Sequence, residues 1–228
     1  MSIKVIGAGF PRTGTMTLKK ALETLGYVET YHFKDLIAKP EKLQYWKELE
    51  NNGNTNFEKL FDGYQATVDF PGYPYYKILL EKYPEAKVIL TKRDFDKWYD
   101  STYKTVWQAG PRTIFAKLAM LAKMIFNTSL RNTFKCIKFM RSTYLNKQFN
   151  NSFASKEHAK KVFFKHIEEV TNHVPKNQLL IYEVTEGWQP LCDFLNVEIP
   201  KEVFPHLNKK EDFHEMVKNM IKAASNGS

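Results

Sequence analysis

The hydrophobic pattern along the chain alternates between short apolar runs and longer helical periodicities. Continuous runs such as KVILT and QLLIY are typical of strands that are buried on both faces of a parallel sheet. Such runs occupy residues 3–8, 65–69, 87–91 and 178–182, and a weaker one lies at 27–31. The pattern therefore predicts about five strands.

Helical periodicity fills the intervals between these runs. The predicted helices cover residues 15–25, 35–50, 73–83, 156–173, 188–195 and 211–224. Strands that alternate with helices predict an α/β fold, with a central, mainly parallel sheet flanked by helices. The chain has 228 residues, of which 43% are hydrophobic, so we expect one domain over residues 1–228.

Residues 101–150 interrupt the alternation and predict two or three helices. Ile114, Leu118, Leu121 and Ile125 form an apolar stripe at helical spacing. Ten Lys and Arg residues, but no Asp or Glu, lie between residues 101 and 156, in a chain whose net charge is +9. We therefore predict an inserted helical cap that covers the substrate site with an apolar, partly basic wall.

A surface of one charge sign attracts anions, such as a nucleotide, an acidic lipid surface or nucleic acid. The basic region lacks regular aromatic interleaving and any known RNA-binding motif, so we expect no nucleic-acid partner. No apolar run reaches the ~18 residues of a membrane span, and no signal peptide is recognised. We predict a cytoplasmic protein without a transmembrane segment, with a peripheral membrane contact as an alternative role for the basic region.

A glycine-rich loop follows the first strand in the string GAGFPRTGTMTL. It keeps the GxxxxG frame of a nucleotide-triphosphate loop, but Thr15 and Met16 replace the Lys and Ser/Thr that contact phosphates and Mg²⁺. Arg12 also occupies the third glycine position of a dinucleotide fingerprint. The loop still predicts an anion site built from the amides of a helix N-terminus. A nucleotide kinase with a degenerate loop and a plain turn capped by threonine are the alternatives.

The string GFPRTGTMTLKKALETLGY resembles the 5′-phosphosulfate loop of the sulfotransferase family. The resemblance implies a fold like that of P-loop kinases, the sulfuryl donor 3′-phosphoadenosine-5′-phosphosulfate (PAPS), the product PAP and no bound metal. It assigns donor binding to Arg12, Thr13, Gly14, Thr15, Met16 and Thr17. Many cytosolic members carry lysine where Arg12 stands, and the arginine form resembles a bacterial-type branch.

A second string, VILTKRDFDKWYDS, resembles the site that binds the 3′-phosphate of PAPS in this family. The resemblance assigns this phosphate to Arg93, just past a strand, and to Ser101 on the following helix. An arginine can donate paired hydrogen bonds to a phosphate, and a serine adds a hydroxyl donor. The alternative is a structural strand end, with Arg93 in an ion pair with Asp94 or Asp96.

The C-terminal region, residues 187–210, loosely resembles the part of the family that covers the nucleotide. Other members place a basic loop on the 3′-phosphate, and the resemblance assigns that contact to Lys209 and Lys210.

The string VDFPGYP places Asp69 where many sulfotransferases carry a catalytic histidine. We predict Asp69 as the general base, Arg12 as the cation that stabilises the departing phosphate, and His32 as an alternative base. All three lie past strand ends, where active sites of open parallel sheets form. An aspartate that only caps a turn is the structural alternative, and Arg12 must not neutralise the carboxylate.

The expected reaction is in-line sulfuryl transfer to a hydroxyl, or to an amine, of a small or lipid-like acceptor. Tyr73, Tyr75, Tyr76 and Trp107 are candidate acceptor contacts near the predicted cap. One sequence determines neither the acceptor nor the oligomeric state. A module that binds membranes or nucleic acid through the basic region is the alternative outside enzymes.

Overall fold

The computed structural model describes residues 2–108 and 113–205 of the chain. Five parallel strands form one sheet with the order β2-β3-β1-β4-β5. They are β1 (Val5–Gly7), β2 (Thr30–Tyr31), β3 (Ala66–Thr67), β4 (Lys87–Thr91) and β5 (Leu179–Tyr182). Each lies inside one of the five predicted runs, so the prediction of a parallel α/β sheet is confirmed.

The central strand β1 positions the site, because the segment that follows β1 leads to β2 on one side of the sheet, whereas the segment that follows its neighbour β4 leads to β5 on the other side. Val5 pairs with Ala66 of β3 on one side and with Lys87 of β4 on the other. The order of the strands therefore reverses at β1, and ligands of open α/β sheets bind at such a point, beyond the carboxyl ends of the strands.

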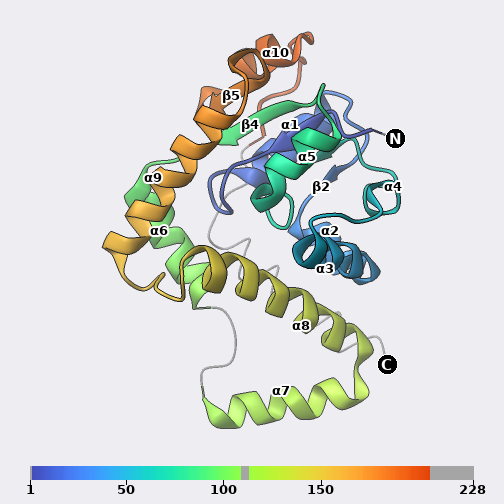
Figure 1. The fold of residues 1–228 in the computed structure, drawn as a ribbon, viewed down its shortest axis with the longest axis vertical. Coiled ribbons are helices and arrows are strands. Elements are labelled where there is room, and N and C mark those ends of the chain that lie inside the picture. Colours follow the sequence, from blue (N-terminus) through green and yellow to red (C-terminus); the bar gives the residue numbers. More distant parts are fainter. Residues whose placement is uncertain (1, 109–112, 206–228) are drawn as a thin grey trace.

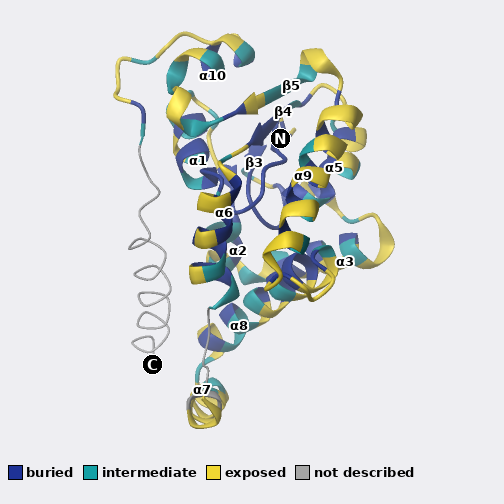
Figure 2. Cartoon of the chain, turned by 90° about the vertical axis from the view of Figure 1, so that its left-hand side faces the viewer, coloured by how far each residue is buried: buried dark blue, intermediate teal, exposed yellow. Residues whose placement is uncertain are grey.

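Helices cover both faces of the sheet, as Figure 2 shows. α1 (Thr15–Thr24) and α10 (Trp188–Leu195) lie on one face, while α5 (Tyr76–Lys82) and α9 (Lys156–His173) lie on the other. Alternate residues of β4 enter separate apolar clusters on the two faces. Strands buried on both faces explain why the runs are continuously apolar.

The predicted helix at 35–50 is divided in the structure. α2 (Phe33–Ala38) and α3 (Leu43–Asn52) are separated by a 3-10 turn, Pro40–Lys42. Proline lacks an amide hydrogen and disfavours helical backbone in the residue before it, so the helix ends at this point. The predicted helix at 73–83 likewise begins as a 3-10 turn, Tyr73–Tyr75, and a short α4 (Phe57–Leu60) was not predicted.

The region of the predicted cap is helical, as expected. α6 (Phe95–Thr102) continues into a π-helical turn, Tyr103–Trp107, and α7 (Ile114–Phe126) is followed by α8 (Thr128–Met140) with its own π-helical extension, Arg141–Gln148. The two parts differ in burial, because α8 and its extension contribute to the main apolar cluster whereas α7 does not. Figure 1 shows α7 at the far end of the molecule, with α8 between it and the sheet.

The predicted wall over the substrate is therefore wrong for α7. Its apolar stripe is exposed, with Ile114 at 62% and Ile125 at 66% of the accessible area. By contrast, the turn Tyr103–Trp107 and α8 with its extension pack against the main apolar cluster. The predicted helix at 211–224 lies outside the described residues.

Candidate active site

The loop between β1 and α1, residues 8–14, passes very close to the end of β4. A Cβ atom on Gly9 would lie 2.0 Å from Thr91 Oγ1, so only glycine permits this approach. The Thr13 hydroxyl donates to the Phe10 carbonyl at 2.6 Å and lies 2.6 Å from Thr91 Oγ1. Its single proton is used inside the loop, so Thr13 holds the loop in shape and its hydroxyl is not a donor to an anion.

Aromatic side chains anchor the same loop from the opposite side. The Phe10 ring packs against the rings of Trp98, Tyr144 and His166, at centroid distances of 5.4, 6.0 and 4.5 Å. Trp98 Nε1 donates to the Pro11 carbonyl at 3.0 Å, and the His166 imidazole bonds to the Ala8 carbonyl at 2.7 Å. Because burial lowers the pKa of His166, the ring is neutral and Nε2 carries the donated proton.

The first turn of α1 has the features of an anion site. Gly14 at the N-cap has φ 108° and no side chain with which to satisfy the helix amides, and the turn contains no acidic residue. Thr15 and Thr17 are buried, and Met16 is half-buried. Amides at a helix start attract anions through the helix dipole and direct hydrogen bonds. The loop therefore has the features of a site for an anionic group.

Arg12, Arg93 and Ser101 converge beside this turn, from three different segments. Arg12 Nε donates to Ser101 Oγ at 3.2 Å, and Arg93 Nη1 donates to the Arg12 carbonyl at 3.2 Å. Asp96 pairs with Lys156 at 2.7 Å, and the described residues show no ion pair of Arg93 with Asp94 or Asp96. Two guanidinium groups and a buried hydroxyl thus lie together, and such groups can bind an anion.

Asp69 follows β3 and is buried, with 6% of its area exposed. The Thr15 hydroxyl donates to its Oδ1 at 2.9 Å, which joins the carboxylate to the start of α1. Burial raises the pKa of Asp69 to about 7, and the opposing effects of the Thr15 hydroxyl, the Phe70 amide and the Arg12 charge are smaller. Arg12 therefore does not keep this carboxyl in its low-pKa range. Arg12 and Asp69 both have positive φ, 73° and 66°, a backbone strain that is common at functional sites.

His32 is the N-cap of α2 and lies against Asp69. Its Nδ1 accepts from the Lys34 amide at 3.2 Å, so the proton of the neutral ring is on Nε2. That nitrogen lies 3.5 Å from Asp69 Oδ2 and 3.4 Å from Thr15 Oγ1. Burial, assisted by nearby cations, lowers the pKa of His32 well below its usual value. A neutral ring that presents an N–H acts as a hydrogen-bond donor toward the carboxylate.

Two buried hydroxyls near the site were missed from the sequence. The hydroxyls of Tyr144 and Thr102 lie next to each other. Apart from this contact, neither hydroxyl has a hydrogen-bond partner in the part of the chain that the structure describes. Tyr144 belongs to the extension of α8, and burial together with the Asp69 charge raises its pKa well above the usual value. Its only sequence signal is a polar aromatic residue within the predicted cap.

Several predicted contacts do not converge on the site. Tyr75 donates to Glu50 Oε2 at 2.6 Å and stacks on Trp46, while Tyr76 packs against the rings of His166 and His173. These two tyrosines are core residues and receive no role in acceptor recognition.

Tyr73 lies beside Asp69, since its amide donates to the Asp69 carbonyl at 3.0 Å, but its hydroxyl donates to Gln148 and its ring contacts Phe10. Trp107 packs against Phe153. Lys209 and Lys210 lie outside the described residues. Within residues 2–108 and 113–205, no three His, Cys, Asp or Glu side chains are grouped so that they could hold a metal ion.

Comparisons with known proteins agree with this geometry. A family model described as a sulfotransferase domain matches residues 4–213. The "Ava biosynthesis cluster protein M" of Aspergillus versicolor is 28% identical over 216 residues, which cover 90% of this chain and 80% of that protein. The family match spans most of the chain and accounts for its P-loop-like fold. The chain therefore belongs to the sulfotransferase family.

Proposed function

We propose that this chain transfers the sulfuryl group of PAPS to a hydroxyl, or to an amine, of a small or lipid-like acceptor, with Asp69 as the general base. Sulfuryl transfer in general follows from the family. The observation that carries the finer proposal is the Thr15–Asp69 hydrogen bond of 2.9 Å. It joins the anion-binding turn directly to a buried carboxylate whose pKa is raised to about 7.

The donor fits the residues at the start of α1. The backbone amides of residues 14–17 and the Arg12 guanidinium suit the 5′-phosphosulfate, and Arg93 with Ser101 suits the 3′-phosphate. When bound, PAPS supplies a sulfuryl group whose bond to the phosphate oxygen breaks as the acceptor oxygen bonds sulfur, leaving PAP. Arg12 then stabilises the negative charge on that phosphate oxygen.

Asp69 accepts the proton that the acceptor hydroxyl loses. A carboxylate with a pKa near neutrality is partly deprotonated at pH 7 and is a stronger base than an exposed aspartate. The Thr15 hydroxyl and the His32 Nε2–H orient it by contacts of 2.9 and 3.5 Å. Because Thr15 also begins α1, the base keeps a constant position relative to the phosphosulfate turn, and this positioning lowers the barrier.

Binding of PAP tests the donor proposal. A ligand at 100 times its Kd stabilises the native state by ~2.7 kcal/mol, which corresponds to a rise in Tm of roughly 5–10 °C for a chain of this size. We expect that rise with PAP and none with Mg·ATP, measured by thermal shift. Transfer of radiolabelled sulfur from PAPS to panels of alcohols, phenols and amines then identifies the acceptor class. A shift with Mg·ATP alone would support the kinase alternative instead.

Tyr144 is the proposed donor of a hydrogen bond to the acceptor. Its hydroxyl is buried near Asp69 and Arg12, and the residue belongs to the helical segment above the sheet edge. We expect Tyr144→Phe to lower kcat/KM for the acceptor by about 3–10-fold, the effect of one neutral hydrogen bond, without weakening PAP binding. Tyr76→Phe removes another buried hydroxyl, on the side of the residue that packs against His173, and should leave the kinetics unchanged. Equal effects of the two variants would exclude this role.

A further inference from the structure

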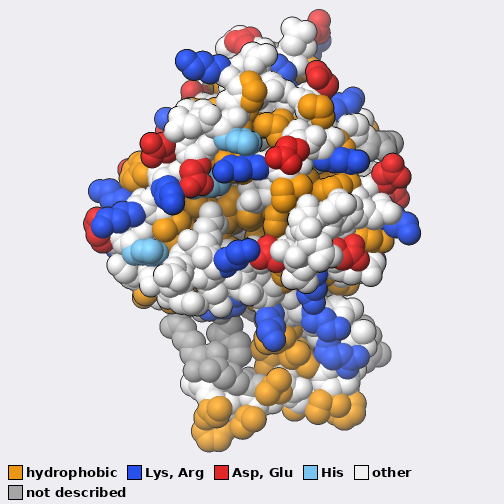
Figure 3. Space-filling model, viewed as in Figure 1, with side chains coloured by type: hydrophobic (Ala, Val, Ile, Leu, Met, Phe, Trp, Pro, Cys, Tyr) orange, Lys and Arg blue, Asp and Glu red, His pale blue; other side chains and the backbone are white. Residues whose placement is uncertain are grey.

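The face of α7 that points away from α8 is apolar and exposed. We call this surface the α7 apolar face, and its residues are Ile114, Phe115, Leu118, Leu121, Ile125 and Phe126. Phe115 is 79% exposed and Phe126 is 90% exposed. Figure 3 shows hydrophobic side chains gathered at this end of the molecule. A contiguous apolar patch of this kind on a protein surface marks an interaction site.

The helix is held in this position by α8, although its outer face has no partner among the described residues. Arg131 Nη1 donates to the carbonyls of Met124 and Ile125, at 2.9 and 2.8 Å, and so satisfies the C-terminal end of α7. Asn127 caps α8 by accepting from the Leu130 amide at 2.8 Å. This ordered connection presents the apolar face outward, at the end of the molecule (Figure 1).

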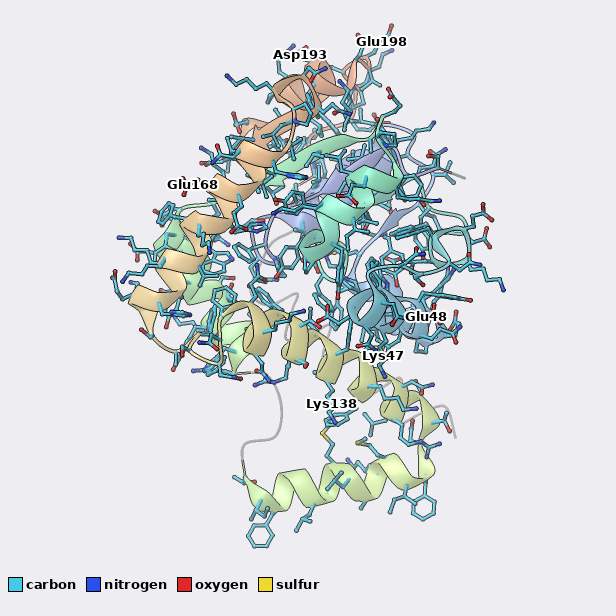
Figure 4. All side chains as sticks on the ribbon, in the orientation of Figure 1. Lys47, Glu48, Lys138, Glu168, Asp193 and Glu198 are labelled. Carbon is cyan, nitrogen blue, oxygen red and sulfur yellow. The ribbon has the colours of Figure 1, made fainter. Side chains whose placement is uncertain are left out.

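The charge beside the apolar face has one sign. Lys123 on α7 and Lys135 and Lys138 on α8 are exposed, and none of the three forms an ion pair with a described residue. Figure 4 places Lys138 on α8, above α7 in this view. No Asp or Glu occurs between residues 101 and 156, so nothing in this stretch of sequence offsets the positive charge. A partner that complements this region therefore has an apolar interior and a negatively charged surface.

We propose that α7 docks the protein onto an anionic lipid bilayer, with the helix axis in the membrane plane. An apolar helix face flanked by lysines binds the headgroup–acyl boundary in this manner, by apolar burial and by attraction to acidic lipids. Across the described residues, no helix has both the length and the apolar character to cross a membrane, so the contact is peripheral. A second copy of the chain is a poorer occupant, because pairing through α7 would bring two basic surfaces together.

A probe attached at residue 118 tests the contact in the full chain. Cys136 and Cys192 are both buried, so a Leu118→Cys variant offers a single accessible thiol among the described residues for a maleimide carrying an environment-sensitive fluorophore. We expect rapid labelling without lipid. We then expect a blue shift on adding phosphatidylglycerol vesicles, a much smaller shift with phosphatidylcholine vesicles, and weaker binding at high salt.

Substitution of the exposed aromatic residues tests the apolar contribution. The double variant Phe115→Asp/Phe126→Asp should lower vesicle binding by at least about tenfold in co-sedimentation, because it removes two exposed rings that would enter the bilayer and adds two negative charges. Val28→Asp places one negative charge at an apolar position that is 65% exposed and lies outside α7, and this variant should bind like the wild type.

Several results would overturn the proposal. They are an unreactive thiol at residue 118 in the lipid-free chain, equal binding of the double variant and the wild type, or no binding to acidic vesicles. A dimer in sedimentation that dissociates on Phe115→Asp/Phe126→Asp would assign the face to a second copy. Normal melting of each variant, measured alongside, separates these results from unfolding.

Discussion

Replacing Asp69 by asparagine is expected to lower kcat for sulfuryl transfer by ~10²–10⁴-fold while PAP binds with unchanged affinity. Asparagine has the same shape and can still accept the hydrogen bond from Thr15, but it cannot accept a proton. The loss therefore falls on the chemical step. Single-turnover kinetics with a saturating acceptor, together with titration of PAP, separates the two quantities. Near wild-type turnover with intact PAP binding would remove Asp69 from the mechanism.

The pH dependence of the rate is a second test of Asp69 as the general base. The base is active when it is deprotonated, and burial raises the pKa of Asp69 to about 7. The rate should therefore fall as the pH falls through about 7 and should reach a plateau above it. The Asp69→Asn variant should lose this limb of the profile, whereas a limb caused by a different group would persist.

His32→Asn is the matched control for the identity of the base. Asparagine is a good N-cap, so it can replace the acceptor that His32 provides to the Lys34 amide and can keep α2 in place. We expect less than a tenfold loss of kcat, because His32 only orients the carboxylate. A loss that equals that of Asp69→Asn, with the acidic limb removed as well, would make His32 the base.

Replacing Arg93 by alanine is expected to weaken the binding of PAP by ~10²-fold and to leave the binding of adenosine 5′-phosphate unchanged. The reason is that charge-assisted hydrogen bonds from a guanidinium to a phosphate are among the strongest in proteins. The two ligands differ only in the 3′-phosphate, so the difference isolates one contact. Calorimetry with both ligands on both proteins provides the four affinities.

Lys92→Ala controls for the loss of a positive charge at the same strand end. Lys92 is exposed and lies 3.7 Å from Glu183, so its charge is screened by solvent and partly offset. We expect PAP affinity within about twofold of the wild type for this variant. If Arg93→Ala weakens PAP and adenosine 5′-phosphate equally, Arg93 supports the loop through the Arg12 carbonyl and does not recognise the 3′-phosphate.

Most of the sheet could be predicted from the sequence, because a strand buried on both faces produces a continuous apolar run that needs no knowledge of its partners. β4 was predicted with the bounds that it has in the structure, and α9 and α10 likewise. The divided helix at 35–50 was the main error in the secondary structure. Its cause, Pro40, is visible in the sequence.

The candidate site was also predictable only in part. Asp69, Arg12 and Arg93 were predicted to lie at one edge of the sheet because each follows a strand, and the resemblance paired Ser101 with Arg93. In the structure Arg12 bonds to Ser101 and Arg93 bonds to Arg12, beyond the carboxyl ends of the adjacent strands β1 and β4. The sequence did not predict that Thr13 would contact Thr91 while Thr15 would bind Asp69. The two threonines are two residues apart in one loop, but their hydroxyls bond to groups that are distant in sequence.

The sequence by itself determined the five strands, most of the helices and the candidate anion loop, because these depend on local periodicity and on residue types at short spacing. Only the tertiary structure decided that Asp69 is buried with a raised pKa, that Tyr144 reaches the site and that α7 faces outward. Each of these properties depends on what surrounds a side chain. That environment is built by residues far apart in the chain, so a local pattern does not contain it.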